Sequence, residues 1–265
     1  MMFLSFFDLL YLIASLLLFS VPLIWNAAPS HPAFTKSIPF ILPTAHIGMT
    51  GSIYLTISLA VERYITVCHP FFKLSHNWPA WVYVLPIVVF SSVFNLPKFF
   101  ELETVERPSY NSTNETLHEN NSLPLYMVQP TDLRLNELYI SGYIVWANFI
   151  INCVFPFLVL IFLNLAVYNE LKKIQVEEVG TSRAGQILRQ KERKLAQVSF
   201  IIVFVFILCH SVRWVPNIWE MCEKDGLEWP VWIEYTTYIS HLLTTFNGTV
   251  NVLIYFIKHG NFTCR

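Results

Sequence analysis

Long apolar runs recur along the chain and are separated by shorter polar stretches. A helix needs about 20 apolar residues to cross a hydrocarbon core about 30 Å thick. The runs reach that length and lack the two-residue alternation of a membrane β-barrel, so helices are the structure that satisfies their backbone polar groups in lipid. The pattern predicts an all-α, polytopic transmembrane helix bundle that forms a single domain, residues 1–265. Its spans are expected at approximately residues 3–25, 39–64, 80–99, 139–168, 195–219 and 232–257. Prolines inside the spans predict kinks near Pro86, Pro156 and Pro216.

Basic residues between the runs predict which way the bundle faces. The loop 169–195 carries seven lysine and arginine residues, whereas the longer loop 100–138 carries only Arg107 and Arg134. Cytoplasmic loops hold the excess of Lys and Arg, so the first loop is expected inside, the second outside, and both termini in the cytoplasm. The outer loop also contains N-glycosylation sequons at Asn111, Asn114 and Asn120.

Composition narrows the class of function. Of 265 residues, 54% are hydrophobic and 13% are charged, the net charge is −1, and the mean hydropathy is +0.49. This balance indicates a membrane protein with no bulk attraction to nucleic acid. The eight histidines are scattered, and the chain has no HExxH pair, Ser/His/Asp grouping or glycine-rich phosphate loop. We therefore expect neither an enzyme nor catalytic residues. The sequence also lacks the matched broken helices of a transporter and the re-entrant segment of a channel.

A charged pair, Glu62 and Arg63, ends an apolar run in "SLAVERYITVCHP". In one interpretation the pair only marks where a helix meets water. In the other it is part of a switch. The segment "LRQKERKLAQVSF" enters the fifth predicted span from the same side, so Glu192 can approach Arg63 if the two helices pack together. Such an ion pair is lost when one helix moves outward.

Several motifs carry a resemblance to a known family. "ERYITVCHPF", the aspartate in "FFDLLYLIASLLLF" and "NVLIY" late in the last span resemble rhodopsin-like (class A) G-protein-coupled receptors, in order along nearly the whole chain. "HIGMTGSIYLTISLAVERYITVCHP", "NLPKFFE" and "VPNIWE" look most like invertebrate FMRFamide-type neuropeptide receptors. The resemblance begins at the family's second helix, so six of its seven helices are expected and the first transmembrane helix is missing. It implies a glycosylated, multi-pass receptor of the plasma membrane, with an extracellular amidated peptide and a heterotrimeric G protein as partners.

The resemblance assigns roles to residues near the inner end and in the last two spans. Arg63, with Pro70 and Phe71, is expected to contact the G protein. His210 stands where the family has tryptophan, and it is either an ordinary core histidine or a group that makes activation pH-sensitive. The expected activation residues are Glu62, Arg63, Tyr64, Glu192, Phe206, His210, Asn251 and Tyr255.

Four positions match those that hold a sodium ion in many such receptors: Asp8, Ser52, Asn247 and Asn251. A buried carboxylate needs a cation or hydrogen-bond donors, and hydroxyl and amide oxygens suit a hard ion. Gly248 replaces a second hydroxyl, so the shell is expected to be incomplete. The alternative is a polar network that satisfies Asp8 without an ion. No other cofactor is expected.

The outer half of such a bundle is the default ligand cleft. Glu220, Glu223, Glu228 and Glu234 around the last outer connection favour a cationic peptide by electrostatic steering, although the same residues suit a solvated rim. Candidates for the cleft follow from helical spacing: His46, Met49, Arg213, Trp214, Asn217, Thr237 and His241.

The chain also departs from the family pattern. Val252 and Val212 replace two prolines, and Ile38 replaces the cysteine of the usual outer disulfide, so the outer loop is either held in another way or less rigid. The missing first helix fits an incomplete gene model, a fragment of a complete receptor or a short isoform. The alternative function is therefore a non-signalling decoy, retained in the endoplasmic reticulum, that pairs with a full-length receptor.

Overall fold

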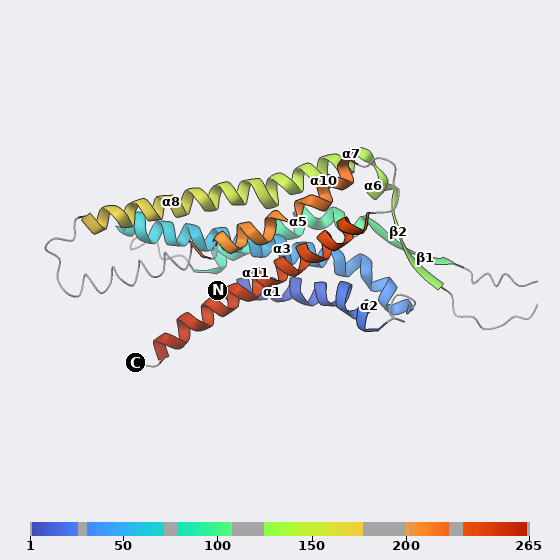
Figure 1. The fold of residues 1–265 in the computed structure, drawn as a ribbon, viewed down its shortest axis with the longest axis horizontal. Helices are drawn as coiled ribbons and strands as arrows, with labels where there is room; N and C mark the ends of the chain where they lie inside the picture. Colours follow the sequence, from blue (N-terminus) through green and yellow to red (C-terminus); the bar gives the residue numbers. More distant parts are fainter. Residues whose placement is uncertain are drawn as a thin grey trace, which may run out of the picture.

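The computed structural model describes residues 2–25, 31–71, 79–107, 125–176, 200–201, 203–222 and 230–263, and over 251–263 it describes the backbone alone. The helices are α1 (Met2–Ser15), η1 (Leu16–Ser20), α2 (Val21–Ile24), α3 (Pro32–Cys68), α5 (Trp81–Asn95), η3 (Leu96–Phe100), α6 (Asp132–Leu135), α7 (Glu137–Tyr139), η4 (Ile140–Ala147), η5 (Ile150–Val154), α8 (Phe155–Val176), α10 (Trp214–Cys222) and α11 (Val231–Thr263). Two strands, β1 (Leu102–Arg107) and β2 (Leu125–Pro130), form a hairpin. The long helices form an elongated bundle with the hairpin at one end and the C-terminal ends of α8 and α11 toward the other (Figure 1).

Apolar helices confirm the predicted class of fold, a multi-pass helical membrane bundle. Among the described residues, four helical stretches are long and apolar enough to cross a membrane, and a shorter apolar helix runs over Val203–Trp219. The four stretches are Phe3–Ser20, Pro32–Cys68, Trp81–Phe100 and Glu137–Lys173. The number of spans in the whole chain stays a prediction, because the gaps in the description fall at both predicted inner loops and beside the fifth span.

The second span begins earlier than the sequence predicted. The expected range was 39–64, but α3 starts at Pro32. A proline in the first turn of a helix costs little, since the first backbone N–H groups have no partner within the helix. Pro39 and Pro43 are buried within α3 and do not end it. In a bundle, packing against neighbouring helices allows such interior prolines.

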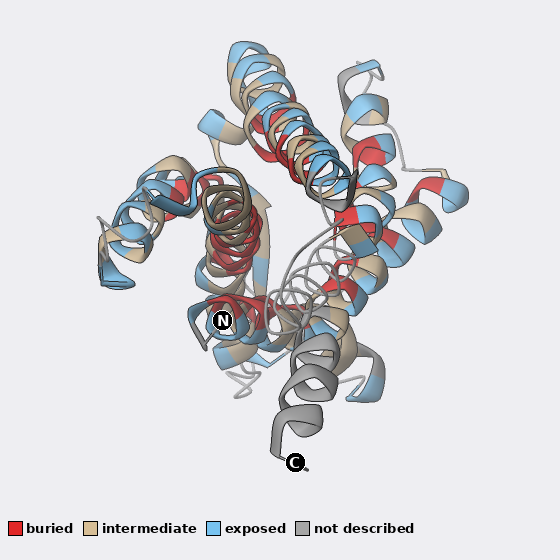
Figure 2. Ribbon diagram, turned by 90° about the vertical axis from the view of Figure 1, so that its left-hand side faces the viewer, coloured by how far each residue is buried: buried red, intermediate tan, exposed pale blue. Residues whose placement is uncertain are grey.

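Helix α3 is the central element of the bundle. Its residues 48–53 are all buried, and because successive residues are about 100° apart, they face every side of the helix. Met49 and Ile53 belong to one apolar core with Tyr11 of α1, Leu160 of α8 and Phe206. Seen along the bundle, buried residues lie mainly on helix sides that face its centre, and exposed residues lie outside (Figure 2). The exposed apolar side chains are those expected to face lipid.

Helices α1 and α3 approach closely at two glycines. A Cβ atom on Gly48 would lie 3.0 Å from the backbone nitrogen of Tyr11 and 3.2 Å from the carbonyl oxygen of Phe7. A Cβ atom on Gly51 would overlap the ring of Phe7. Small residues let transmembrane helices pack at short range, and here they bring the polar residues of α1 against α3.

The helix that leads into α8 is wound as a π-helix in η4 and η5. Pro156 follows directly, and its ring would clash with the carbonyl four residues earlier in a regular α-helix. A widened turn relieves that clash. The hydroxyl of Tyr54 on α3 donates a 2.9 Å hydrogen bond to the carbonyl of Ile151 within the π-helical stretch. The irregular backbone is therefore fixed by a side chain of the central helix.

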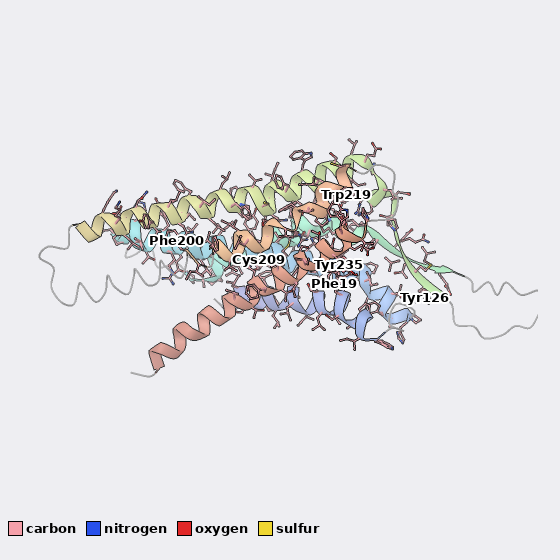
Figure 3. The ribbon with its side chains drawn as sticks, in the orientation of Figure 1. Phe19, Tyr126, Phe200, Cys209, Trp219 and Tyr235 are labelled. Carbon is pink, nitrogen blue, oxygen red and sulfur yellow. The ribbon has the colours of Figure 1, made fainter. Side chains whose placement is uncertain are left out.

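The segment 203–222 is interrupted at Val212 and Arg213, where the backbone forms a turn between two helical parts. The N–H of Val215 bonds to the carbonyl of Val212 at 3.2 Å, a tighter turn than an α-helix makes. Pro216 has no N–H to give to that same carbonyl, which explains the position of the break. Cys209 and Trp219 lie on the two sides of it (Figure 3).

The predicted outer loop contains the β1–β2 hairpin, which the sequence analysis missed. The strands pair antiparallel from Leu102 opposite Pro130 to Arg107 opposite Leu125. The hydroxyl of Thr131 donates a 2.6 Å hydrogen bond to the carbonyl of Phe100 and so holds the end of β2 beside η3. Short, polar strands of this kind leave only a weak alternation in the sequence, which apolar runs on either side obscure.

Two charge contacts tie this outer loop to the bundle. The ammonium of Lys36 on α3 lies 4.2 Å from the ring centroid of Tyr126 on β2, at the hairpin (Figure 3). Lys98 and Glu101 form a buried ion pair at 3.3 Å, with 6% and 5% of their side chains exposed. Tyr139 of α7 donates a 2.9 Å hydrogen bond to the same carboxylate. The four described cysteines form no disulfide. The loop is therefore held to the bundle by non-covalent contacts.

We expect Glu101→Gln to lower the stability of the protein by about 3–5 kcal/mol, because it leaves the Lys98 ammonium buried without a counter-charge. The measurement is the thermal unfolding midpoint of purified protein in detergent. Glu170→Gln is the matched control: its partner Lys173 lies at the same 3.3 Å, but the two side chains are 34% and 71% exposed. That change should cost less than about 1 kcal/mol. Equal effects of the two substitutions would contradict a buried anchor.

Candidate functional site

Asp8 lies in a polar pocket between α1, α3 and α11. The hydroxyl of Ser52 on α3 donates a hydrogen bond to its carboxylate. Asn247 on α11 is 3% exposed, and its side-chain carbonyl oxygen has no hydrogen-bond partner among the described residues. A Cβ atom on Gly248 would lie 3.2 Å from Cβ of Asp8, so the absence of a side chain there lets α11 approach α1. Three of the four predicted polar residues thus meet, and the side chain of Asn251 lies outside the description.

A small cavity extends from this pocket toward the outer half of the bundle. Its volume is about 10 Å³, close to the room that one water molecule needs. On one side it is bounded by Asp8, Ser52 and Asn247, and on the other by Tyr11, Met49 and His210. The cavity therefore connects the predicted sodium site with the floor of the predicted ligand cleft.

Phe206 and His210 lie one helical turn apart in the centre of the bundle. Both are buried, with 1% and 4% of their surface exposed. Their ring centroids are 4.4 Å apart, and Phe157 of α8 packs edge-on against Phe206. These residues stand just before the interruption at 212–213. Their predicted role in activation stays a prediction.

Arg213 occupies the interruption itself and faces α3. Its guanidinium donates a hydrogen bond to the sulfur of Met49 and a 3.4 Å hydrogen bond to Nδ1 of His46. Trp214, the next residue, is buried and packs edge-to-face against Phe149, with centroids 5.0 Å apart. The helix break thus turns a cationic side chain into the bundle and anchors the following residue in an apolar contact.

His241 joins the same cluster from α11. Its Nδ1 and the hydroxyl of Tyr11 form a hydrogen bond of 2.9 Å. The ring of Phe19 lies against the imidazole, with centroids 4.3 Å apart. Tyr11 also interacts with the guanidinium of Arg213. Four predicted cleft residues, His46, Met49, Arg213 and His241, are therefore connected through α1, α3 and α11.

Among the described residues, the hydrogen-bond and ring contacts of the other predicted cleft residues lie outside this cluster. Thr237 is half-buried, and its hydroxyl bonds to the carbonyl of Ile233 in its own helix at 2.9 Å. Asn217 on α10 is half-buried. Trp214 packs against Phe149, between η4 and η5, and not against the Arg213 cluster.

The charged pair, Glu62 and Arg63, lies near the predicted inner end of α3. Glu62 is exposed and Arg63 is half-buried, and Arg63 forms no ion pair with any described residue. Tyr64 is hydrogen-bonded to Nε2 of His69 at 3.2 Å. Beyond α3, Pro70 is exposed and Phe71 has 85% of its surface exposed. An exposed phenylalanine beside the end of the central helix suits contact with a partner protein.

Some predicted residues fall outside the part of the chain that the structure describes. Glu192 and the sequons at Asn111, Asn114 and Asn120 are among them, and so are the side chains of Asn251 and Tyr255. The Arg63–Glu192 ion pair and the glycosylation of the outer loop stay predictions.

Sequence reasoning missed several polar residues of the site. Tyr11 follows Asp8 by three positions and Thr244 precedes Asn247 by three, so helical periodicity could have placed both beside known candidates. Asn95, which donates a 3.0 Å hydrogen bond to the hydroxyl of Thr50, links α5 to α3. The pairing of Lys98 with Glu101 at i, i+3 was also available from the sequence.

The family model described as "7 transmembrane receptor (rhodopsin family)" matches residues 1–255. The chain belongs to the rhodopsin family of seven-transmembrane receptors. This family consists of receptors and not enzymes. The receptor is thus a multi-pass membrane protein.

Individual relatives are similar over most of the chain. An FMRFamide receptor of Drosophila melanogaster is 33% identical over 258 residues, which are 94% of this chain and 43% of the relative. An FMRFamide peptide receptor of Caenorhabditis elegans is 25% identical over 96% of the chain and 56% of the relative. The human cysteinyl leukotriene receptor 2 is 26% identical over 83% of the chain and 57% of the relative. The chain thus spans about half the length of these curated relatives.

Proposed function

We propose that this receptor binds an extracellular, amidated FMRFamide-like neuropeptide and passes the signal to a heterotrimeric G protein. The observation that carries the proposal is the 33% identity to the Drosophila FMRFamide receptor over 94% of the chain. The geometry supports it. The outer half of the bundle gathers polar side chains from three long helices, and the inner end of α3 presents Phe71 to a partner.

The proposed mechanism is outward movement of the sixth family helix, which contains residues 203–222. Peptide binding favours the state in which that helix is displaced, the Arg63–Glu192 ion pair is broken and a groove opens for the G protein. The interruption at 212–213 supports this mechanism, because a turn between two helical parts is a natural pivot. Arg213 at the pivot contacts α3 directly, so a ligand bound there acts on the hinge itself.

The function is tested by expressing the complete coding sequence that contains residues 1–265 at the cell surface and measuring G-protein activation. A panel of amidated peptides that includes FMRFamide should give saturable responses. Surface labelling of an extracellular tag serves as the control for plasma-membrane localisation. If the labelled receptor stays silent to every peptide of the panel, the neuropeptide proposal is wrong. Retention in the endoplasmic reticulum would instead support the decoy function.

The helix movement predicts that Glu192→Ala raises signalling in the absence of peptide, because it removes the ion pair that holds the inactive state. We expect a severalfold increase in basal G-protein activation per receptor at the surface. Glu178→Ala removes an acidic side chain from the same predicted inner loop and should leave the basal activity unchanged. Basal activities that are equal for wild type and Glu192→Ala would remove the support for the ion pair.

We further propose that the Asp8 pocket holds a sodium ion. The residues fit: a carboxylate, a hydroxyl and an unpaired amide oxygen surround a cavity of about 10 Å³. Bound sodium would stabilise the state in which α1, α3 and α11 are closely packed around Asp8.

Replacing KCl by NaCl at constant ionic strength should therefore raise the thermal midpoint of the purified receptor by several degrees. Asp8→Asn should abolish this difference between the two salts. Asp132→Asn, a change in the exposed short helix α6, should preserve it. A midpoint that does not distinguish the two salts would favour the alternative of a polar network without an ion.

A further inference from the structure

Basic side chains gather where the floor of the predicted outer cleft is expected. Lys98, Arg213 and His241 all lie near enough to His46 to interact with it electrostatically. They come from η3, the interruption at 212–213, α11 and α3, so the folded bundle brings together groups that are far apart in the sequence. The floor of the predicted cleft is therefore basic, below the acidic rim that the sequence also indicated.

Within this cluster, Arg213 is the cation that has no ion-pair partner among the described residues. Lys98 is neutralised by Glu101 at 3.3 Å. Arg213 forms no ion pair with any residue that the structure describes, and its contacts are the sulfur of Met49, the ring nitrogen of His46 and the hydroxyl of Tyr11. None of these groups carries a full negative charge in its usual state.

The guanidinium also has hydrogen-bonding capacity to spare. It carries five N–H donors in a rigid planar fork, and its three contacts leave donors for a further acceptor. Placing such a group in a bundle without a counter-charge is costly, and an acceptor from the ligand would recover part of that cost. The fork matches the two oxygens of a carboxylate, and it can also donate to the single carbonyl oxygen of a carboxamide.

We propose that Arg213 binds the C-terminal carbonyl group of the peptide, with His46 and His241 beside it. The shared chemistry is a planar terminal group with an acceptor oxygen, either a carboxamide or a carboxylate. This inference rests on the proposed function, and it adds the orientation of the ligand. The peptide enters with its C terminus toward α3 and its remaining residues toward the rim.

Helix geometry extends this orientation to a second group of the ligand. Glu234 is exposed in the first turn of α11, seven residues before His241 and on the same helix face. Seven residues rise about 10 Å along a helix. An extended peptide covers that distance in about three residues. A cationic side chain within about three residues of the C terminus can therefore meet the acidic rim while the terminal carbonyl contacts Arg213.

The test is a double-mutant cycle on the surface-expressed receptor from its complete coding sequence. The variants are wild type and Arg213→Gln, and the probes are FMRFamide and an analogue in which a terminal methyl group replaces the carboxamide. On wild type, the analogue should be about 10- to 100-fold less potent, the loss expected for one charge-assisted hydrogen bond. On Arg213→Gln, FMRFamide should lose a similar factor, and the analogue should lose little more.

Two further measurements identify the terminal group that binds and control for the loss of a positive charge. The free acid of the same peptide tests whether a carboxylate serves better than the carboxamide, and the more potent form identifies the group that the floor prefers. Arg134→Gln removes a basic residue from α6 at the outer end and should leave the potency ratio of the two probes unchanged.

The inference is overturned if Arg213→Gln weakens FMRFamide and the carbonyl-free analogue by the same factor, since Arg213 would then have a structural role only. Should Arg213→Gln fail to reach the surface, Arg213→Lys repeats the cycle with the charge kept and the planar fork lost. Equal potency of the two probes on wild type overturns the inference without any variant. With each of these outcomes the wild-type receptor still responds to the peptide. Silence of the wild type to every peptide would instead overturn the proposed function itself.

Discussion

The close packing of α1 against α3 is the constraint on which both polar sites depend. There is no room for a Cβ atom on Gly48 or Gly51 at this contact. The backbone of α1 lies against Gly48, and the ring of Phe7 lies against Gly51. Asp8 and Tyr11 are one turn apart on α1 and therefore sit at different depths of the same interface. Asp8 accepts a hydrogen bond from Ser52, and Tyr11 bonds to His241. A wider separation of α1 and α3 would remove the first contact and displace the second.

The charged groups of the bundle lie at three different depths along its axis. The buried Asp8 carboxylate lies below Arg213 and its two histidines at the floor of the predicted cleft, and Glu234 lies exposed at the rim. The small cavity bounded by Asp8, Met49 and His210 separates the first two levels. Because the dielectric constant is low inside a membrane bundle, opposite charges at these depths influence each other strongly. A ligand carbonyl at Arg213 and a cation at Asp8, as proposed above, would therefore act on neighbouring groups.

The described part of the outer end is held by buried polar contacts, and the four described cysteines form no disulfide. Lys98, Glu101 and Tyr139 form one network, and Lys36 packs on Tyr126 of the hairpin. The break at 212–213 arises from the same kind of local chemistry, since Pro216 leaves the carbonyl of Val212 without its helical partner. The receptor thus combines a hairpin beside a buried ion pair with a helix break set by one proline.

The sequence by itself determined the helical membrane fold, the family and the polar candidates Asp8, Ser52 and Asn247, because apolar length and short motifs are local properties of the chain. It also predicted the break before Pro216, since a missing N–H acts on a residue only four positions away. It did not predict that α3 begins at Pro32, that residues 102–130 contain a hairpin or that Tyr11 meets His241. Only the tertiary structure decided that Arg213 lacks a carboxylate partner among the described residues while Lys98 has one. Those outcomes depend on how each helix is rotated and how closely it approaches its neighbours, and that geometry is set by packing across the whole bundle.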